Sequence, residues 1–88
     1  MNQEELNKII ENHKHWLNQD CKGWQTMRAN LSGADLTYSC LNRVNLTNAD
    51  LRFTNLINMH LKDTFLDNAN LKGAILKSTI IEINKKLT

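Results

Sequence analysis

The chain lacks the features of several protein classes. No apolar run among its 88 residues approaches the roughly 18 to 20 residues of a membrane-spanning helix, so we expect no membrane partner. Residues 1–5 lack the basic and apolar segments of a secretory signal peptide, which makes the cytoplasm the expected location. The two cysteines, Cys21 and Cys40, match no metal-binding or redox spacing, and we expect both thiols to be free in a reducing compartment.

An excess of charge of one sign is also missing. Residues 1–28 carry equal numbers of basic and acidic side chains, and so do residues 29–83. The formal net charge of +2 therefore comes from Lys85 and Lys86. Proteins that bind duplex DNA normally cluster basic side chains, because phosphate neutralisation supplies much of their affinity. The sequence predicts no nucleic-acid partner.

Residues 1–28 are predicted to form a helix and a short connector. Asn2, with Glu5 three residues later, is typical of a capping box at the start of a helix. Apolar and aromatic side chains then recur at helical spacing up to about residue 18: Leu6, Ile9, Ile10, His13, Trp16 and Leu17. Residues 19–28 lose this spacing, and the expected buried anchors of the connector are Trp24 and Met27.

Residues 29–83 follow a period of five. They read ANLSG, ADLTY, SCLNR, VNLTN, ADLRF, TNLIN, MHLKD, TFLDN, ANLKG, AILKS, TIIEI. The first position is small or slim except at Met59, and the third position is always leucine or isoleucine. Two inward positions two residues apart are typical of an extended segment of three residues, so the last two residues of each repeat must turn the chain. The third positions form the predicted core ladder: Leu31, Leu36, Leu41, Leu46, Leu51, Leu56, Leu61, Leu66, Leu71, Leu76 and Ile81.

The tandem Ala-Asn/Asp-Leu-x-x motif resembles that of the pentapeptide-repeat family. The resemblance covers residues 29–83 and implies a right-handed quadrilateral β-helix with four repeats in each coil. Residues twenty apart then stack, so Leu31 lies beside Leu51 and small residues lie beside small ones, as a ladder core requires. It also implies that the second-position Asn and Asp side chains support the turns, because both residues cap local backbone groups. The expected fold class is an all-β solenoid of about three coils with an N-terminal α-helical cap.

We expect one domain in three parts: a helical cap and connector at 1–28, the β-helix at 29–83 and a tail at 84–88. The ends of a stacked array expose backbone groups and leucines, so they need covers. The cap residues expected over the first coil are Leu6, Ile9, Ile10, Trp16, Leu17 and Trp24. The carboxyl end shows no equivalent segment. Its apolar side chains are the predicted self-association surface, unless the tail folds under the last coil and covers them: Ile75, Ile80, Ile83 and Leu87.

One pair of residues invites a chemical interpretation, because Cys40 and His60 would lie one coil apart in an outward column. Two ligands do not close a zinc site, and a Cys–His nucleophile needs a cleft and a third, orienting group. The sequence contains no glycine-rich phosphate loop, nucleophile triad or pair of acids either. We therefore predict no catalytic residue, metal site or cofactor. We expect His13 to pack within the helix stripe and His15 to be solvated.

The predicted function is a non-catalytic scaffold. We expect it to form a homo-oligomer, most simply a dimer through the C-terminal coil, and to bind a protein partner that the sequence does not identify. The outward apolar residues Phe53, Ile57 and Phe65 could instead build a side-by-side contact. One alternative is the family's best-studied activity, in which acidic dimers resemble duplex DNA and act on DNA gyrase, but this array is neutral and short. Another is a small-molecule or metal site at Cys40 and His60.

Overall fold

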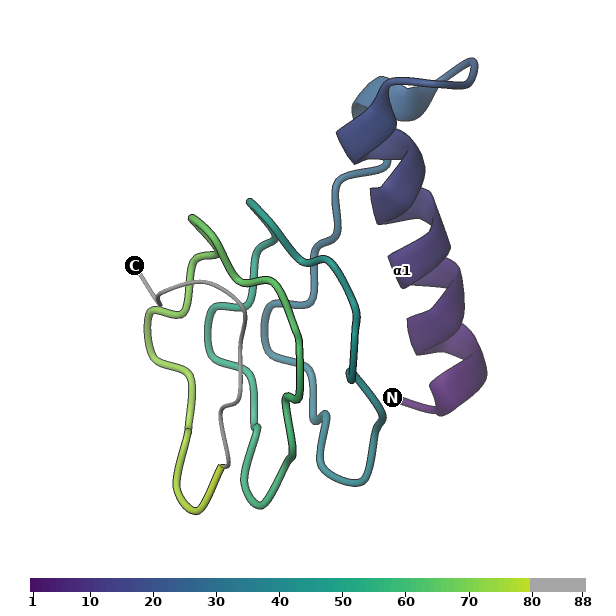
Figure 1. The fold of residues 1–88 in the computed structure, drawn as a ribbon. Helices are drawn as coiled ribbons and strands as arrows, with labels where there is room; N and C mark the ends of the chain where they lie inside the picture. Colours follow the sequence, from purple (N-terminus) through teal and green to yellow (C-terminus); the bar gives the residue numbers. More distant parts are fainter. Residues whose placement is uncertain (80–88) are drawn as a thin grey trace.

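A computed structural model of the chain describes residues 1–79 (Figure 1). It contains the α-helix α1 (Gln3–Asn18) and the 3-10 helix η1 (Trp24–Thr26), followed by a chain that winds back on itself. The predictions that concern Ile80, Ile81, Ile83 and Leu87 lie outside the described residues.

The start of α1 confirms the predicted capping box. The side-chain oxygen of Asn2 accepts a hydrogen bond from the backbone N–H of Glu5 at 2.8 Å, and the Asn2 amide donates to the Glu5 carboxylate at 2.9 Å. The helix ends where Gln19 takes a left-handed conformation, with φ of 52°. The Gln19 N–H then donates to the carbonyl of His15 at 2.7 Å, which closes the last turn.

Each repeat turns at its last two residues, as the period of five predicts. The fifth residue of every repeat from Gly33 to Ser78 has a positive φ, between 57° and 73°. The N–H of the next residue donates back to the carbonyl of the third-position leucine, for example from Ala34 to Leu31 at 3.0 Å. A positive φ at the third residue of such a four-residue turn is what a type II turn requires. The chain therefore changes direction once in every repeat.

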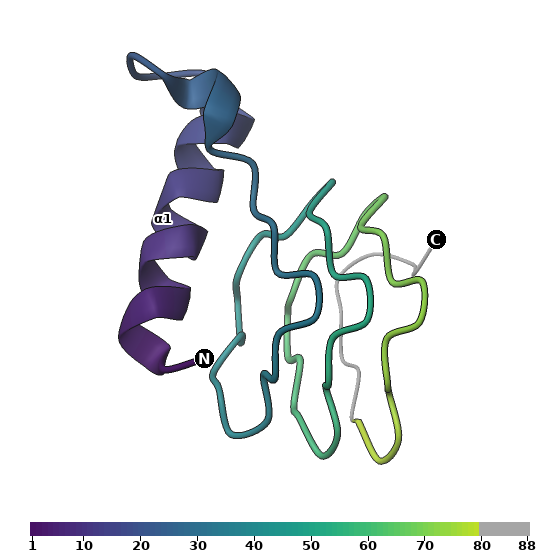
Figure 2. The ribbon, with the colours of Figure 1, turned by 180° about the vertical axis from the view of Figure 1, so that it is seen from behind.

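Residues twenty apart lie side by side. Parallel bridges join Asn30 to Asp50 and Asp50 to Asn70, and the N–H groups of Leu31 and Leu51 each donate to the next coil at 2.8 Å. Four repeats therefore separate each position from its neighbour in the stack, and successive coils lie against one another in Figures 1 and 2. Within residues 1–79 the pairing consists of isolated bridges, without strands, because a turn interrupts each extended segment after three residues.

The third-position side chains point into the coils. The ladder members with at most 2% exposure are Leu31, Leu36, Leu41, Leu46, Leu51, Leu56, Leu61 and Leu66. Leu71 and Leu76 are partly buried and pack against this cluster. The inward threonines also have polar partners, since Thr54 Oγ1 donates to the carbonyl of Leu51 at 2.9 Å and Thr64 Oγ1 to that of Leu41 at 2.8 Å.

The second-position Asn and Asp side chains support the turns, as predicted. In each case a side-chain oxygen accepts the backbone N–H two residues later, at 3.0 or 3.1 Å. This contact satisfies an amide that the turn leaves without a backbone partner. The six residues are Asn30, Asp35, Asn45, Asp50, Asn55 and Asn70.

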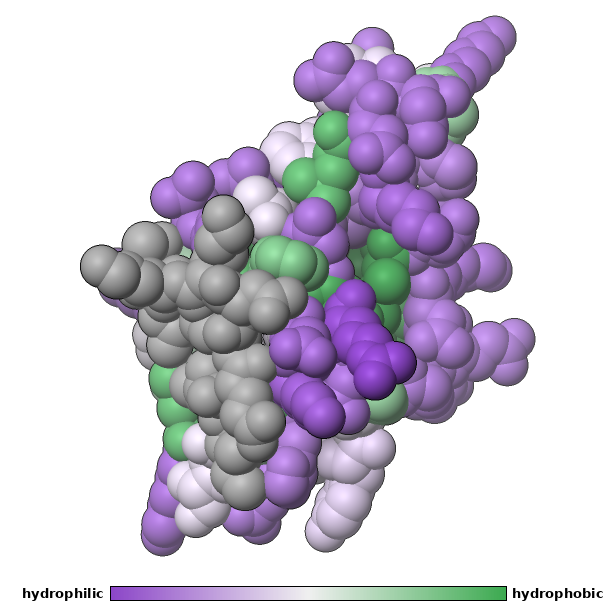
Figure 3. Space-filling view, in the orientation of Figure 1, coloured by the Kyte–Doolittle hydropathy of each residue, from purple (hydrophilic) through white to green (hydrophobic). Residues whose placement is uncertain are grey.

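α1 lies across the first coil, at the end of the stack opposite the last described repeats (Figures 1 and 2). Leu6 is fully buried and joins the leucine cluster, and Ile9 and Ile10 pack against it. The outer side of α1 is hydrophilic in the space-filling view (Figure 3). No helix among residues 1–79 is long and apolar enough to span a membrane.

Candidate functional site

His13 joins α1 to the first coil through both of its ring nitrogens. Nδ1 accepts a hydrogen bond from the backbone N–H of Ala29 at 2.9 Å, and Nε2 lies 2.8 Å from the carbonyl oxygen of Thr47. A backbone N–H can only donate and a carbonyl can only accept. Nδ1 therefore carries no proton, Nε2 carries one, and the ring is neutral.

The surroundings of His13 favour this neutral form. The side chain is fully buried, and burial lowers its pKa below the ordinary value. The positive charge of Arg28 lowers the pKa further, while the hydrogen bond to Thr47 partly opposes the shift. Trp16 stacks on the ring, with centroids 5.4 Å apart and planes 13° from parallel. The interface between α1 and the repeats thus contains the uncharged imidazole of His13.

Two side chains of the cap bind backbone groups at the edge of the first coil. The amide of Gln3 pairs with Cys40, accepting its N–H at 2.9 Å and donating to its carbonyl at 3.4 Å. Arg28 Nε donates to the carbonyl of Asn48 at 2.7 Å. The first coil has no preceding coil to pair with, so these polar contacts replace the missing backbone partners. Sequence reasoning predicted only an apolar cover.

The predicted cap is only partly correct. Leu6 is buried, but Leu17 and Trp16 are partly exposed. Trp24 and Met27, the expected buried anchors of the connector, are likewise only partly buried. The physical reason is the direction of the connector, since η1 lies beyond the end of the first coil in Figure 1.

The array opens between Cys40 and His60. Neighbouring positions of these two coils form bridges, but within residues 1–79 no bridge joins this pair. A groove of about 520 Å³ lies here, lined in part by Cys40, His60 and Tyr38. Met59, only 3% exposed, is the one large side chain at a first position, so the coils enclose more volume at this point. No third His, Cys, Asp or Glu among the described residues joins Cys40 and His60 in a group able to hold a metal ion.

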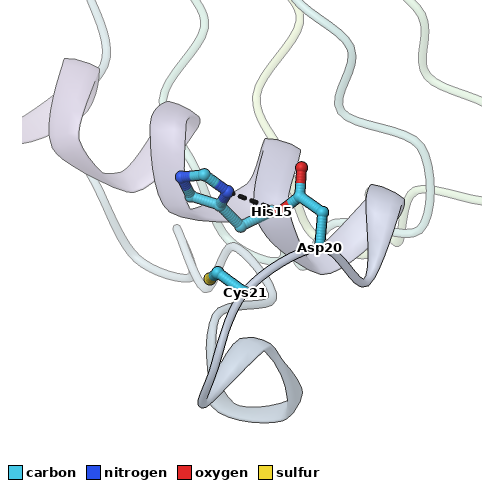
Figure 4. Close-up of side chains that lie close together, drawn as sticks. All are labelled: His15, Asp20 and Cys21. Atoms are coloured by element: carbon cyan, nitrogen blue, oxygen red, sulfur yellow. Dashed lines mark hydrogen bonds and ion pairs between the residues drawn. The ribbon is translucent and has the colours of Figure 1, made fainter.

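A different cluster gathers three kinds of metal ligand at the carboxyl end of α1 (Figure 4). His15, Asp20 and Cys21 each offer one ligand atom, and these atoms lie within 4.8 Å of one another. His15 Nδ1 is 2.6 Å from Asp20 Oδ1, so His15 is paired and not simply solvated as predicted. Sequence reasoning missed this cluster because the spacing gives no signal until the helix end and the reversal at Gln19 are known.

Some outward apolar side chains are strongly exposed. Tyr38 is fully exposed, Phe53 is 60% exposed and Ile75 is 48% exposed. Ile57 and Phe65 are only partly exposed. Of the predicted self-association residues, Ile75 is therefore the one that the described part of the chain places at the surface.

Comparison with known proteins gives one match. The family model described as "Pentapeptide repeats (8 copies)" matches residues 29–64 and residues 49–82. No curated protein and no solved structure matches the chain. The two matched segments overlap and together span more than half of the chain, over the same residues that follow the period of five. The chain belongs to the pentapeptide-repeat family.

Proposed function

We propose that the chain is a non-catalytic repeat scaffold of the cytoplasm. Its array is a right-handed quadrilateral β-helix that α1 covers at one end, and it self-associates as a homodimer through the C-terminal coil. The dimer presents the outer faces of the coils to a protein partner. The twenty-residue spacing of the bridges supports the four-sided coil, and membership of the family supports its hand.

The decline of burial along the core ladder carries the self-association part of this proposal. The ladder leucines from Leu31 to Leu66 are at most 2% exposed, whereas Leu71 and Leu76 are only partly buried. Ile75 lies between these two and is 48% exposed. Apolar surface at the end of a stack favours association, and a twofold axis lets one such surface bury itself against its own copy.

The first coil is a poor candidate for this contact. α1 already lies over it, with Leu6 buried in the ladder and Gln3 paired with the backbone of Cys40. Addition of a second copy there would require α1 to leave. The two ends of the stack therefore differ, and this difference favours a closed dimer over an open filament.

Imitation of duplex DNA, the alternative, requires uncompensated negative charge. Asp50, at the second position of its repeat, accepts hydrogen bonds from Arg52 Nε at 2.9 Å and Nη2 at 2.8 Å. This contact lowers the pKa of Asp50 and neutralises its charge locally. A supercoiling assay with purified gyrase tests the alternative, and inhibition at low micromolar protein would overturn our preference for a scaffold.

Light scattering on the intact protein tests the dimer, with Ile75→Lys as the main variant and Phe53→Lys as its matched control. Both positions are exposed and outward, so each lysine adds the same charge to the surface. We expect a dimer for the parent, dissociation for Ile75→Lys and no change for Phe53→Lys. Loss of association in Phe53→Lys alone would favour a side-by-side contact, and a monomeric parent would overturn the proposal. A variant with Ile80→Lys and Ile83→Lys extends the test to residues outside the described part.

A further inference from the structure

We propose that His15, Asp20 and Cys21 form a binding site for a zinc ion (Figure 4). The three side chains supply an imidazole nitrogen, a carboxylate oxygen and a sulfur, with one ligand atom from each within 4.8 Å of the others. The site is separate from the self-association surface and does not depend on the proposed function. It also revises the expectation of no metal site.

The end of α1 brings these donors together. His15 lies in the last turn of the helix, and the left-handed residue Gln19 reverses the chain immediately after Asn18. The hydrogen bond from the Gln19 N–H to the His15 carbonyl fixes this reversal. Asp20 and Cys21 therefore return beside the ring instead of continuing along the helix axis (Figure 4). The carboxyl end of a helix carries partial negative charge, which favours a cation here.

The donor set suits zinc. Zinc binds histidine nitrogen at about 2.0 to 2.1 Å, carboxylate oxygen at a similar distance and cysteine sulfur at about 2.3 Å. Tetrahedral bonds of these lengths place the donor atoms roughly 3.3 to 3.6 Å apart. His15 Nδ1 and Asp20 Oδ1, now 2.6 Å apart, must separate slightly to admit the ion. The His15 and Asp20 side chains are 34% and 44% exposed, so water can reach the fourth position.

Glu11 stands on the other side of the imidazole. Its carboxylate oxygen lies 3.8 Å from His15 Nε2, one helical turn earlier in α1. A ligating histidine commonly directs its second nitrogen toward a carboxylate, which fixes the ring orientation and makes the ligating nitrogen more basic. Glu11 is placed to act in this way while Nδ1 binds the ion.

Binding requires the loss of protons from the ligand atoms. His15 Nδ1 faces the carboxylate of Asp20, and the Cys21 thiol donates to the thioether of Met27 at 3.8 Å. When Zn²⁺ binds Nδ1 of the neutral imidazole, the proton on Nδ1 moves to Nε2, which faces Glu11, and the proton on Cys21 Sγ is released to solvent. Affinity should consequently fall as the pH is lowered. A bound ion would link the helix to the connector and stabilise the cap.

Titration calorimetry with ZnCl₂ on the full-length protein, stripped of metal and kept reduced, tests the proposal. We expect one ion per chain. Cys21→Ser and Asp20→Asn should each weaken binding at least about tenfold, since even outer partners of metal ligands contribute 10- to 100-fold. Cys40→Ser is the matched control, because Cys40 is the other free thiol and contacts Gln3 at the start of α1, whereas His15 lies in the last turn of that helix. It should bind zinc as the parent does.

Cobalt gives a second measurement that depends on the sulfur ligand. Co²⁺ in place of Zn²⁺ should produce a thiolate-to-metal absorption band in the parent and in Cys40→Ser, but not in Cys21→Ser. Circular dichroism of each variant shows whether it is folded. Absence of stoichiometric zinc binding in the folded parent would overturn the proposal. Loss of binding in Cys40→Ser with retention in Cys21→Ser would overturn it too and move the site to Cys40 and His60.

Discussion

The backbone N–H of Ala29 donates a hydrogen bond to His13 Nδ1 at 2.9 Å, so the first residue of the repeat array is bound to α1. The same ring reaches Thr47 in the last repeat of the first coil at 2.8 Å. One side chain thus joins the helix to both the beginning and the end of that coil. We therefore expect the helix to fold together with the array, and its interface depends on a neutral imidazole.

Replacement of His13 tests how much this interface contributes. His13→Phe keeps an aromatic ring but leaves the Ala29 N–H and the Thr47 carbonyl without their partner. Each buried group left unsatisfied costs about 1 to 3 kcal/mol, so the loss of both partners should lower the free energy of unfolding by about 2 to 6 kcal/mol. Urea denaturation measures the change. His60→Phe, at an exposed position, is the control and should change stability by less than about 0.5 kcal/mol.

The same contact predicts a pH dependence. Burial lowers the pKa of His13 in the folded state, whereas the unfolded state has the ordinary value of about 6.5. Below about pH 6.5 the unfolded chain therefore binds more protons than the folded chain does. The contribution of His13 to the free energy of unfolding is lost as the pH falls through the folded pKa. Above about pH 6.5 this contribution is fully present.

Urea midpoints measured between pH 7.5 and pH 5 check the sign. They should fall with the pH in the parent and fall less steeply in His13→Gln, whose amide does not titrate. A chelator in the buffer removes any metal effect at His15. Equal slopes for the two proteins would contradict the assignment of this dependence to His13.

The register of the array is tested in the second coil. Leu56 is 1% exposed in the ladder, while Asn58 is exposed at the turn position with φ of 61°. Leu56→Asp buries a charge in an apolar core and should prevent folding. Asn58→Asp should leave the stability almost unchanged, because Asn and Asp both tolerate a positive φ. Circular dichroism of the two purified variants measures the difference, and comparable effects would rule out this register.

The repeat array could be predicted from the sequence because its rule is local. Small and large inward residues, turn residues and second-position Asn or Asp recur within every five residues, so Leu31, Asn30 and Gly33 already define one complete unit. The capping box at Asn2 is local in the same sense. Each of these features needs only a few neighbouring residues to form.

The contacts between α1 and the array could not be predicted in this way. His13 meets partners 16 and 34 residues away, and a hydrophobic stripe shows which face is buried but not which polar groups it meets. The partial exposure of the connector side chains has a similar cause. The left-handed residue Gln19 sets the direction of the connector and also brings Cys21 back to His15. The prediction of burial rested only on the aromatic character of Trp24.

Two glycines at equivalent positions separate backbone strain from side-chain contact. Gly33 and Gly73 end their repeats with φ of 73° and 72°. A Cβ at Gly33 would meet no atom within 4 Å, whereas one at Gly73 would lie 2.4 Å from Cδ1 of Phe53. The ring of Phe53 therefore packs directly over the glycine of the next coil.

Gly33→Ala should cost about 1 to 2 kcal/mol, the cost of a left-handed conformation for a residue with a Cβ. Gly73→Ala should cost more, because the Phe53 ring must also move away from its contact. In a Phe53→Ala background the two glycine substitutions should lower the stability equally, because only the strain of the left-handed backbone remains. Thermal and urea unfolding of the parent, the three single variants and the two double variants measure these differences. If Gly73→Ala and Gly33→Ala were equal with Phe53 present, the ring would contribute nothing to the stacking of these two coils.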